Sequence, residues 1–168
     1  MGFTEIQPEL LADNPFKLIG KDWMLITAAT QGSFNTMTAS WGGLGVLWEK
    51  RVAFCFIRPT RHTYGFMEQA GEFTLSFFPE QHRKALVFCG SRSGRDTDKI
   101  KGTGLVPVKK DKVVYFEEAR IVLVCRKLYF QDLSPEQFLD PKISEMYPLK
   151  DYHRMYAGEL VQCLVKES

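Results

Sequence analysis

The chain lacks the motifs by which several common enzyme classes are recognised. Its 168 residues contain no His-Glu-x-x-His, no Gly-x-Ser-x-Gly and no Walker loop, since the glycines of residues 42–45 are not followed by Lys and Ser or Thr. The three histidines, His62, His82 and His153, have no metal-ligand spacing with one another or with the cysteines. No carboxylate pair stands out for hydrolysis. These absences disfavour zinc chemistry and leave room for an enzyme in which a cofactor carries out the difficult step.

Signals of disulfide bonds, membrane insertion and strong charge are also missing. Cys55, Cys89, Cys125 and Cys163 are far apart and form no Cys-x-x-Cys pair, so we expect buried, reduced thiols and a cytoplasmic protein. No apolar run approaches the ~20 residues of a membrane span. Residues 1–14 carry acidic and polar residues where a secretory leader would be apolar, so we expect no leader. The net charge of +2 points to neither nucleic acid nor membrane as the main partner.

Aromatic residues are plentiful and favour a β-rich core. They make up 13% of the chain and include 13 Phe, whereas the hydrophobic share of 45% and the charged share of 25% are ordinary. At this length we expect residues 1–168 to form a single domain. Runs rich in Val, Ile, Phe, Thr and Tyr predict strands. They cover residues 23–30, 36–40, 52–57, 72–78, 112–116, 120–130 and 159–165.

Helical signals are fewer. Pro79 favours the start of a helix over residues 79–88, residues 62–70 predict a short second helix, and Ser134 followed by Pro marks another N-terminus. Residues 90–99 form a predicted polar loop. The pattern therefore indicates a mainly β fold with peripheral helices, in which one antiparallel sheet forms a closed or nearly closed barrel, because closure removes exposed strand edges.

Two polar segments flank the predicted strand at residues 52–57. Residues 35–42 (Asn-Thr-Met-Thr-Ala-Ser-Trp-Gly) alternate short hydroxyl side chains with apolar ones. Residues 58–64 (Arg-Pro-Thr-Arg-His-Thr-Tyr) combine two guanidinium groups with hydroxyls and an imidazole. Guanidinium and hydroxyl groups donate hydrogen bonds to phosphate, and a flat apolar wall such as Trp41 suits an aromatic ring system. Together the segments predict a site for a phosphorylated, planar cofactor.

With these motifs the chain resembles the flavin reductase-like, FMN-binding split-barrel proteins, which include flavoredoxin. Residues 35–42 and 58–64 are followed, in the family's order, by residues 93–99 (Ser-Gly-Arg-Asp-Thr-Asp-Lys) and 152–156 (Tyr-His-Arg-Met-Tyr). Residues 14–16 (Asn-Pro-Phe) fit as well, so the resemblance covers about residues 14 to 165. It implies a six-stranded antiparallel split barrel of Greek-key type that binds FMN.

The resemblance also implies a homodimer with FMN near the subunit interface and NADH or NADPH as the hydride donor. Asn35, Trp41 and His153 would then approach the isoalloxazine ring, with backbone groups of residues 36–38 at its polar edge. Ser40 would face either the ribityl chain or the phosphate. The implied cofactor-binding residues are Asn35, Thr36, Met37, Thr38, Ser40, Trp41, Arg58, Thr60, Arg61, His62, Thr63, Lys99 and His153, those from Arg58 to Lys99 serving the phosphate. No catalytic residue and no metal ligand is assigned.

Each of these residues also has an interpretation that needs no ligand. The alternating hydroxyls of residues 36–40 would face solvent as on any half-exposed strand, and both arginines would be solvated or paired with carboxylates. Trp41 would lie in the core, and Lys99 would form an ion pair within its loop. His153 would be a surface or dimer-contact histidine.

The leading functional hypothesis is a flavin oxidoreductase in which the nicotinamide delivers hydride to the flavin. The alternative is a non-enzymatic electron carrier or FMN-binding module, which would exchange electrons with another protein. A pyridoxamine-phosphate oxidase-like barrel would share the flavin but oxidise an amine. A nucleic-acid-binding barrel is disfavoured by the net charge of +2 and by the lack of a stripe of arginines and aromatics.

Overall fold

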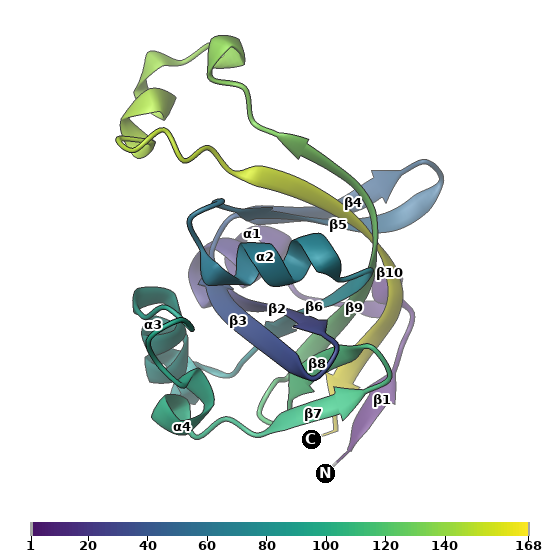
Figure 1. Ribbon diagram of the computed structural model, residues 1–168. Coiled ribbons are helices and arrows are strands. Elements are labelled where there is room, and N and C mark those ends of the chain that lie inside the picture. Colours follow the sequence, from purple (N-terminus) through teal and green to yellow (C-terminus); the bar gives the residue numbers. More distant parts are fainter. Residues whose placement is uncertain (1, 168) are drawn as a thin grey trace.

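The fold is built on one antiparallel sheet that curls into a split barrel (Figure 1). The computed structural model describes residues 2–167. Strands follow one another in the order β3-β2-β6-β9-β10-β5-β4, and β1 also pairs with β10. Within the described residues no ladder joins β3 to β4, so the barrel stays open between these two strands. The strands are β1 Phe3–Glu5, β2 Met24–Thr30, β3 Ser33–Ala39, β4 Gly42–Leu47, β5 Lys50–Ile57, β6 Glu72–Phe77, β9 Ile121–Asp132 and β10 Arg154–Lys166.

Short helices and a small second sheet surround this barrel. The second sheet pairs β7 (Pro107–Lys110) with β8 (Val113–Phe116). The helical segments are η1 Pro8–Leu10, α1 Pro15–Lys17, η2 Leu18–Asp22, α2 His62–Gln69, η3 Glu80–His82, α3 Arg83–Ser91, α4 Lys99–Thr103, η4 Pro135–Gln137 and η5 Pro141–Met146. Across residues 2–167, none of the helices combines the length and apolar character needed to cross a membrane.

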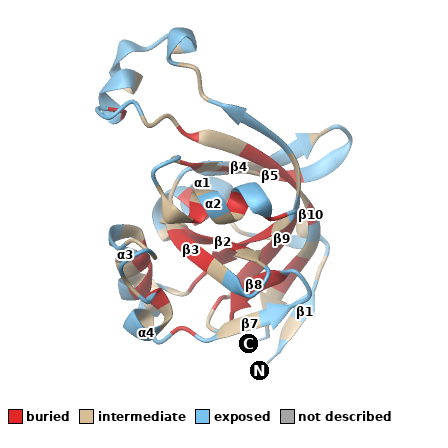
Figure 2. Cartoon of the chain, in the orientation of Figure 1, coloured by how far each residue is buried: buried red, intermediate tan, exposed pale blue. Residues whose placement is uncertain are grey.

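The central strands are buried on both faces (Figure 2). On β2, Ile26 packs into the barrel interior while its neighbour Leu25 packs outward beneath α3 and the second sheet. On β9, Leu123 likewise packs into the barrel interior and Val124 packs outward. Successive side chains of a strand point to opposite faces, so a strand covered on both sides needs a continuous apolar run rather than an alternating one. This explains the unbroken apolar sequence of residues 121–125.

The mainly β, antiparallel split-barrel class predicted from the sequence is confirmed, in its nearly closed form. Every predicted strand is present, but the main sheet has eight strands rather than six. Strand β4 escaped prediction because its glycines have low strand propensity. The signal at Ser134 leads only to the single turn of η4. All four cysteines are buried and free, as expected.

The connection between β9 and β10 leaves the barrel as a projecting arm, residues 133–153 (Figure 1). The arm carries η4 and η5, and most of it is exposed (Figure 2). Its fold is held by an aromatic cluster in which the rings of Phe138, Tyr147 and Tyr152 lie 5.1–5.9 Å apart between centroids. The arm is therefore a small packed unit of its own and returns to the barrel at His153.

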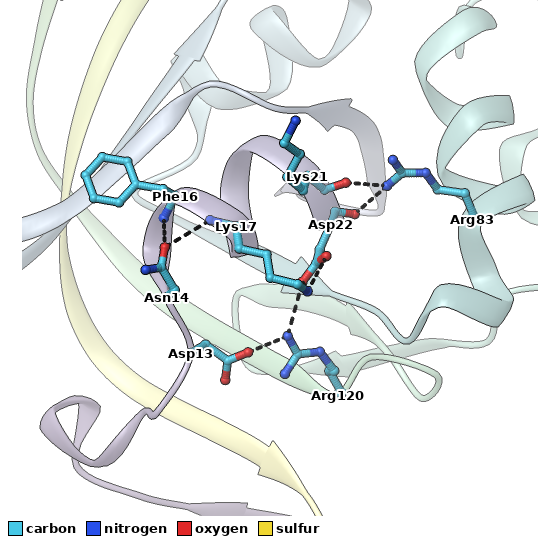
Figure 3. Close-up of polar contacts among 8 residues, drawn as sticks. All are labelled: Asp13, Asn14, Phe16, Lys17, Lys21, Asp22, Arg83 and Arg120. Atoms are coloured by element: carbon cyan, nitrogen blue, oxygen red, sulfur yellow. Dashed lines mark hydrogen bonds and ion pairs between the residues drawn. The ribbon is translucent and has the colours of Figure 1, made fainter.

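A polar network fixes the N-terminal segment against the barrel (Figure 3). The Asn14 side chain accepts hydrogen bonds from the backbone N–H groups of Phe16 and Lys17 at 3.0 and 3.2 Å and so caps α1. Asp22 pairs with Lys17 at 2.9 Å. Arg83 of α3 donates to the carbonyl oxygens of Lys21 and Asp22 at 2.8 and 2.9 Å. The network leaves the Phe16 ring pointing away from these polar groups, into the open (Figure 3).

Candidate functional site

Three adjoining cavities lie beside the carboxyl-terminal ends of β3 and β5. The cationic cavity, about 210 Å³, is bounded by residues 60–63, residues 90–95 and Lys99. The central cavity, about 200 Å³, is bounded by residues 37–41, Phe56, Arg58, Arg61 and His153. The apolar cavity, about 540 Å³, lies between the arm, the N-terminal segment and β4. Arg61 borders both the cationic and the central cavity, and Trp41 borders both the central and the apolar cavity, so the three are neighbours.

Arg61 is the cation between the first two cavities. It is the N-cap residue of α2, directly after the turn that leaves β5. Its Nη2 atom is buried and has no hydrogen-bond partner within residues 2–167. Burial and the neighbouring charge of Arg58 lower the pKa of Arg61. A buried guanidinium N–H without an acceptor is costly, and an anion in the adjoining cavity would remove that cost.

Lys99 forms the inner end of the cationic cavity. It opens helix α4 and is 6% exposed, with its Nζ donating to the carbonyl oxygens of Thr36 and Cys89 at 2.7 and 2.9 Å. These two bonds leave one of the three ammonium protons for a ligand. Burial, with a smaller effect of the Arg61 charge, lowers the pKa of Lys99 to about 8. The loop ion pair with Asp96 or Asp98 does not form; Asp98 caps α4 instead.

Asn35 joins three of the segments singled out from the sequence. Its Nδ2 donates to Thr63 Oγ1 at 2.8 Å, which ties β3 to the first turn of α2. Its Oδ1 lies against Gly94, where an added Cβ would be only 2.2 Å away, and the same Cβ would be 3.0 Å from His62. Residue 94 must therefore be glycine for the loop to approach so closely. Burial and the charges of Arg95 and Lys99 lower the pKa of His62.

The hydroxyl side chains of β3 are more buried than we expect for a strand that faces solvent. Thr36 is buried and shares a 2.9 Å hydrogen bond with Thr27 Oγ1. Thr38 is half-buried and donates to the carbonyl of Leu86 in α3. Ser40 lies beyond the end of β3, at the border of the central and apolar cavities. The hydroxyls of Thr36 and Thr38 are therefore used in hydrogen bonds within the protein. Only the end of the strand and the residues after it, 37–41, border the central cavity.

Trp41 and His153 close one side of the central cavity. Trp41 is 44% exposed and therefore not a core residue, and its ring lies 5.1 Å from the His153 ring. His153 is buried, with Nδ1 hydrogen-bonded to Tyr147 Oη at 2.7 Å. Burial, reinforced by the Arg58 charge, lowers the pKa of His153 to about 4. At neutral pH the imidazole is uncharged, so it adds shape and hydrogen bonding to the cavity but no net charge.

Arg58 differs sharply from Arg61, although the two are close in sequence. Its guanidinium pairs with Asp151 at 2.8 Å, donates to the Met146 carbonyl at 2.9 Å and lies 4.6 Å from the centre of the Tyr147 ring. Thr60 also donates to Asp151, at 3.1 Å. Arg58 thus binds the arm to the end of β5. The interpretation in which the arginines pair with carboxylates therefore holds for Arg58 but not for Arg61.

The structure brings the sequence-predicted residues together. All of them border the central or the cationic cavity except Asn35 and Thr36, which lie behind the cationic cavity and hold Thr63 and Lys99 in place. The sequence reasoning missed Phe56, Tyr147 and Asp151. Phe56 could have been found from its position in the predicted strand before the arginines, whereas no local signal connects Tyr147 or Asp151 with this site.

The chain matches one family model and shares its fold with several solved structures. A family model described as a flavin reductase like domain matches residues 17–168. No curated protein sequence matches the chain. Among solved structures, the chain is similar to the FMN-binding domain of a flavin reductases-like enzyme from Shewanella baltica OS155, with 16% identity and a TM-score of 0.70 over 97% of this chain and 76% of that chain.

Two further solved structures have the same fold. One is an FMN-binding protein from Thermus thermophilus, with 20% identity and a TM-score of 0.70 over 97% of this chain and 79% of that chain. The other is a flavoredoxin from Desulfovibrio vulgaris (Miyazaki F), with 19% identity and a TM-score of 0.69 over 96% of this chain and 78% of that chain.

Proposed function

Because the chain belongs to the flavin reductase like domain family, we propose that it is an FMN-binding oxidoreductase that takes hydride from NADH or NADPH. The observation that carries the proposal is the unpartnered Nη2 of Arg61, buried between two cavities. An orphaned guanidinium donor needs an acceptor, and phosphate oxygens match it in charge and geometry.

The phosphate of FMN would bind in the cationic cavity. Arg61 and Lys99 would each donate a charge-assisted hydrogen bond there, and residues Thr60 and Thr63 also line this cavity. His62, whose pKa is lowered by burial and by the charges of Arg95 and Lys99, adds a ring to the lining of this cavity. Arg58 contributes through the arm that it anchors, since its guanidinium already has two acceptors.

The central cavity would hold the flavin ring. Trp41 and Phe56 supply its apolar walls, and His153 supplies a neutral, hydrogen-bonded edge that remains uncharged throughout the physiological pH range. When bound, FMN would supply the two-electron redox chemistry. These side chains orient the ring and exclude water from its surface, and Arg61 and Lys99 hold the anionic end in a fixed position.

The binding assignment is tested by comparing FMN with riboflavin, which lacks the phosphate. Replacing Arg61 with Ala removes a charged donor worth about 2 kcal/mol, so FMN affinity should fall about thirtyfold while riboflavin affinity is unchanged. Arg126→Ala is the charge-matched control, because Arg126 is exposed and paired with Glu159 outside the cavities. Equal losses for both flavins would contradict the phosphate assignment.

The enzymatic part is tested by anaerobic mixing of FMN-loaded protein with NADH and with NADPH. Loss of the oxidised flavin band faster than with free FMN would support a reductase and identify its donor. Bound flavin that neither nucleotide reduces would favour the non-enzymatic electron carrier, which receives its electrons from another protein.

We also propose that two copies form a homodimer, with FMN near the interface, through the projecting arm. Leu139 and Leu149 on the arm are 97% and 80% exposed, and Met146 beside the apolar cavity is 54% exposed. Large apolar side chains gathered on one projecting segment are typical of a surface that another molecule covers.

A further inference from the structure

Helix α2, which lies between β3 and β5 (Figure 1), is tied to the barrel at both ends. At its start, Asn35 of β3 donates to Thr63. At its end, the Lys127 ammonium of β9 donates to the carbonyl oxygens of Met67 and Glu68 at 2.5 and 3.1 Å. A cation at the last carbonyls of a helix satisfies acceptors that the helix itself leaves unpaired. The position of α2 is therefore set from both ends.

A second set of contacts joins the end of α2 to β10. Glu68 accepts hydrogen bonds from Tyr156 Oη at 2.5 Å and from Arg154 Nη1 at 3.0 Å. The Nε and Nη2 groups of Arg154 donate to Asp132 at 2.7 and 2.9 Å. Asp132 and Arg154 are paired residues at the end of β9 and the start of β10. We call these four residues, Glu68, Asp132, Arg154 and Tyr156, the α2 clamp.

The side chains of the α2 clamp are confined rather than freely solvated. Only 16% of the Arg154 side chain is exposed, and its guanidinium lies 4.4 Å from the centre of the Phe130 ring. Tyr156 is fully buried, so its hydroxyl needs the acceptor that Glu68 provides. Burial, with the hydrogen bond to Glu68, raises the pKa of Tyr156 and keeps the phenol protonated as the donor. Such a network holds its geometry more firmly than an isolated surface ion pair.

The α2 clamp connects the elements that carry Arg61 and His153. Arg61 is the N-cap residue of α2 and borders the cationic and the central cavity. His153 directly precedes Arg154 and borders the central cavity. Successive side chains of extended backbone point to opposite sides, so His153 can face the cavity while Arg154 faces α2. The separation of Arg61 from His153 therefore depends on how α2 is held against β10.

We propose that Glu68 is a positioning residue that holds α2 at the distance from β10 at which one ligand can occupy the cationic and the central cavity together. An anionic group at Arg61 and a ring beside His153 are two linked binding groups. Linked groups gain affinity only when their separation matches that of their sites. A ligand that occupies one cavity alone does not depend on this distance. With FMN as the ligand, the inference rests on the proposed function.

Three ligands test the inference: FMN spans both cavities, whereas riboflavin lacks the anion and inorganic phosphate lacks the ring. Glu68→Ala removes both bonds to β10, so FMN should bind about tenfold more weakly, while riboflavin and inorganic phosphate stay within about twofold of their wild-type Kd. Calorimetric titration measures the two flavins, and a thermal-shift titration measures inorganic phosphate. Unchanged FMN affinity, or an equal loss for all three ligands, would overturn the inference.

Hydrogen exchange on the flavin-free protein gives a readout that needs no flavin. In Glu68→Ala the backbone amides of α2 (His62–Gln69) should exchange about tenfold faster, because one of the attachments of the helix is lost. Exchange at the wild-type rate would show that Glu68 does not hold α2, and the inference would be wrong.

Two variants separate positioning from a general loss of stability. Glu159→Ala removes a carboxylate of the same strand, β10, whose ion pairs within residues 2–167 are with Arg126 of β9 and Lys50 of β5. FMN affinity and the exchange of α2 should stay unchanged in this control. Glu68→Gln keeps an acceptor for Tyr156 and should restore FMN affinity to within about threefold of wild type. Equal losses in Glu159→Ala and Glu68→Ala, or no rescue by Gln, would contradict the role given to Glu68.

Failure of this inference differs from failure of the proposed function. Wild-type protein that binds no FMN would overturn the proposed function, and the part of this inference that concerns FMN would fall with it. Wild-type protein that binds FMN, together with a Glu68→Ala variant that binds it equally well, would overturn this inference alone.

Discussion

Arg58 and Arg61 have the same side chain and are only three positions apart, yet they do different things. The guanidinium of Arg58 donates hydrogen bonds to Asp151 and to the Met146 carbonyl, whereas Arg61 has a buried N–H group with no acceptor in residues 2–167. Arg61 is the N-cap residue of α2 and borders both cavities, whereas Arg58 is paired with the arm. At the scale of the residue, the ability of a side chain to bind a ligand therefore depends on whether the fold leaves its polar atoms without a hydrogen-bond partner.

Lys99 gives the candidate site a pH dependence of known sign. Its pKa of about 8 lies below the ordinary lysine value, so the unfolded chain binds more protons between these two values. The free energy of unfolding of the ligand-free protein should therefore rise as pH increases through that range. FMN affinity should change in the opposite sense, because the ammonium that we propose binds the phosphate is lost.

Titration of FMN at pH about 7 and about 9.5 measures this effect, and we expect the wild-type Kd to weaken about tenfold. Lys99→Gln should bind FMN more weakly at the lower pH and show little pH dependence. Lys101→Gln is the control, since Lys101 follows on the same helix but is exposed. A wild-type Kd that is constant over this range, or one that varies equally for riboflavin, would contradict the role given to Lys99.

At the scale of the element, the site depends on the close approach of the loop at residues 92–98 to β3 and α2. Gly94→Ala would place a Cβ 2.2 Å from Asn35 Oδ1, so Asn35 would have to move and its bond to Thr63 would break. We expect the free energy of unfolding to fall by about 2 kcal/mol and FMN affinity to fall with it. Chemical denaturation and flavin titration measure the two effects.

Gly65→Ala is the matched control. Gly65 lies inside α2 with nothing within 4 Å of an added Cβ, so this change should stabilise the protein by up to about 1 kcal/mol. If both alanine variants changed stability in the same direction, the close approach at Gly94 would not be the reason for its glycine.

The arm is a separate element whose attachment is predicted to depend on one ion pair. Asp151→Asn keeps the size of the side chain but removes its charge, which leaves Arg58 half-paired. Local opening of the arm should become easier by about 1–2 kcal/mol, and trypsin should cut at Lys142 and Lys150 about tenfold faster. Asp96→Asn, an exposed change outside the arm, should leave the cleavage pattern unchanged. Unaltered cleavage in Asp151→Asn would show that the aromatic cluster alone holds the arm.

At the scale of the whole molecule, the projecting arm leads to a prediction about assembly. Sedimentation velocity should give twice the 19.3 kDa chain mass, and Leu139→Glu combined with Leu149→Glu should give monomers, because charges cannot be buried unpaired in an apolar contact. Val106→Glu, at an exposed position away from the arm, should remain dimeric. A wild-type protein that sediments as a monomer would refute the proposed dimer.

The sequence by itself determined the strand-rich class and the chemistry available to the site. Side-chain shape and apolar pattern act locally, which is why β2, β5, β6 and β9 could be predicted from their own residues. The motifs at residues 35–42 and 58–64 contained the donors and the aromatic wall, so their residue types already indicated a phosphorylated, planar ligand.

Only the tertiary structure decided which of those donors are free. The partner of Arg58 is 93 residues away, and the acceptors of Lys99 lie on a different strand and a different helix. Strand β4 exists because β5 offers its backbone groups for pairing, although glycine itself disfavours a strand. Whether a side chain is paired, buried or left without a hydrogen-bond partner depends on contacts between residues that are far apart in the sequence. A local sequence pattern does not contain this information.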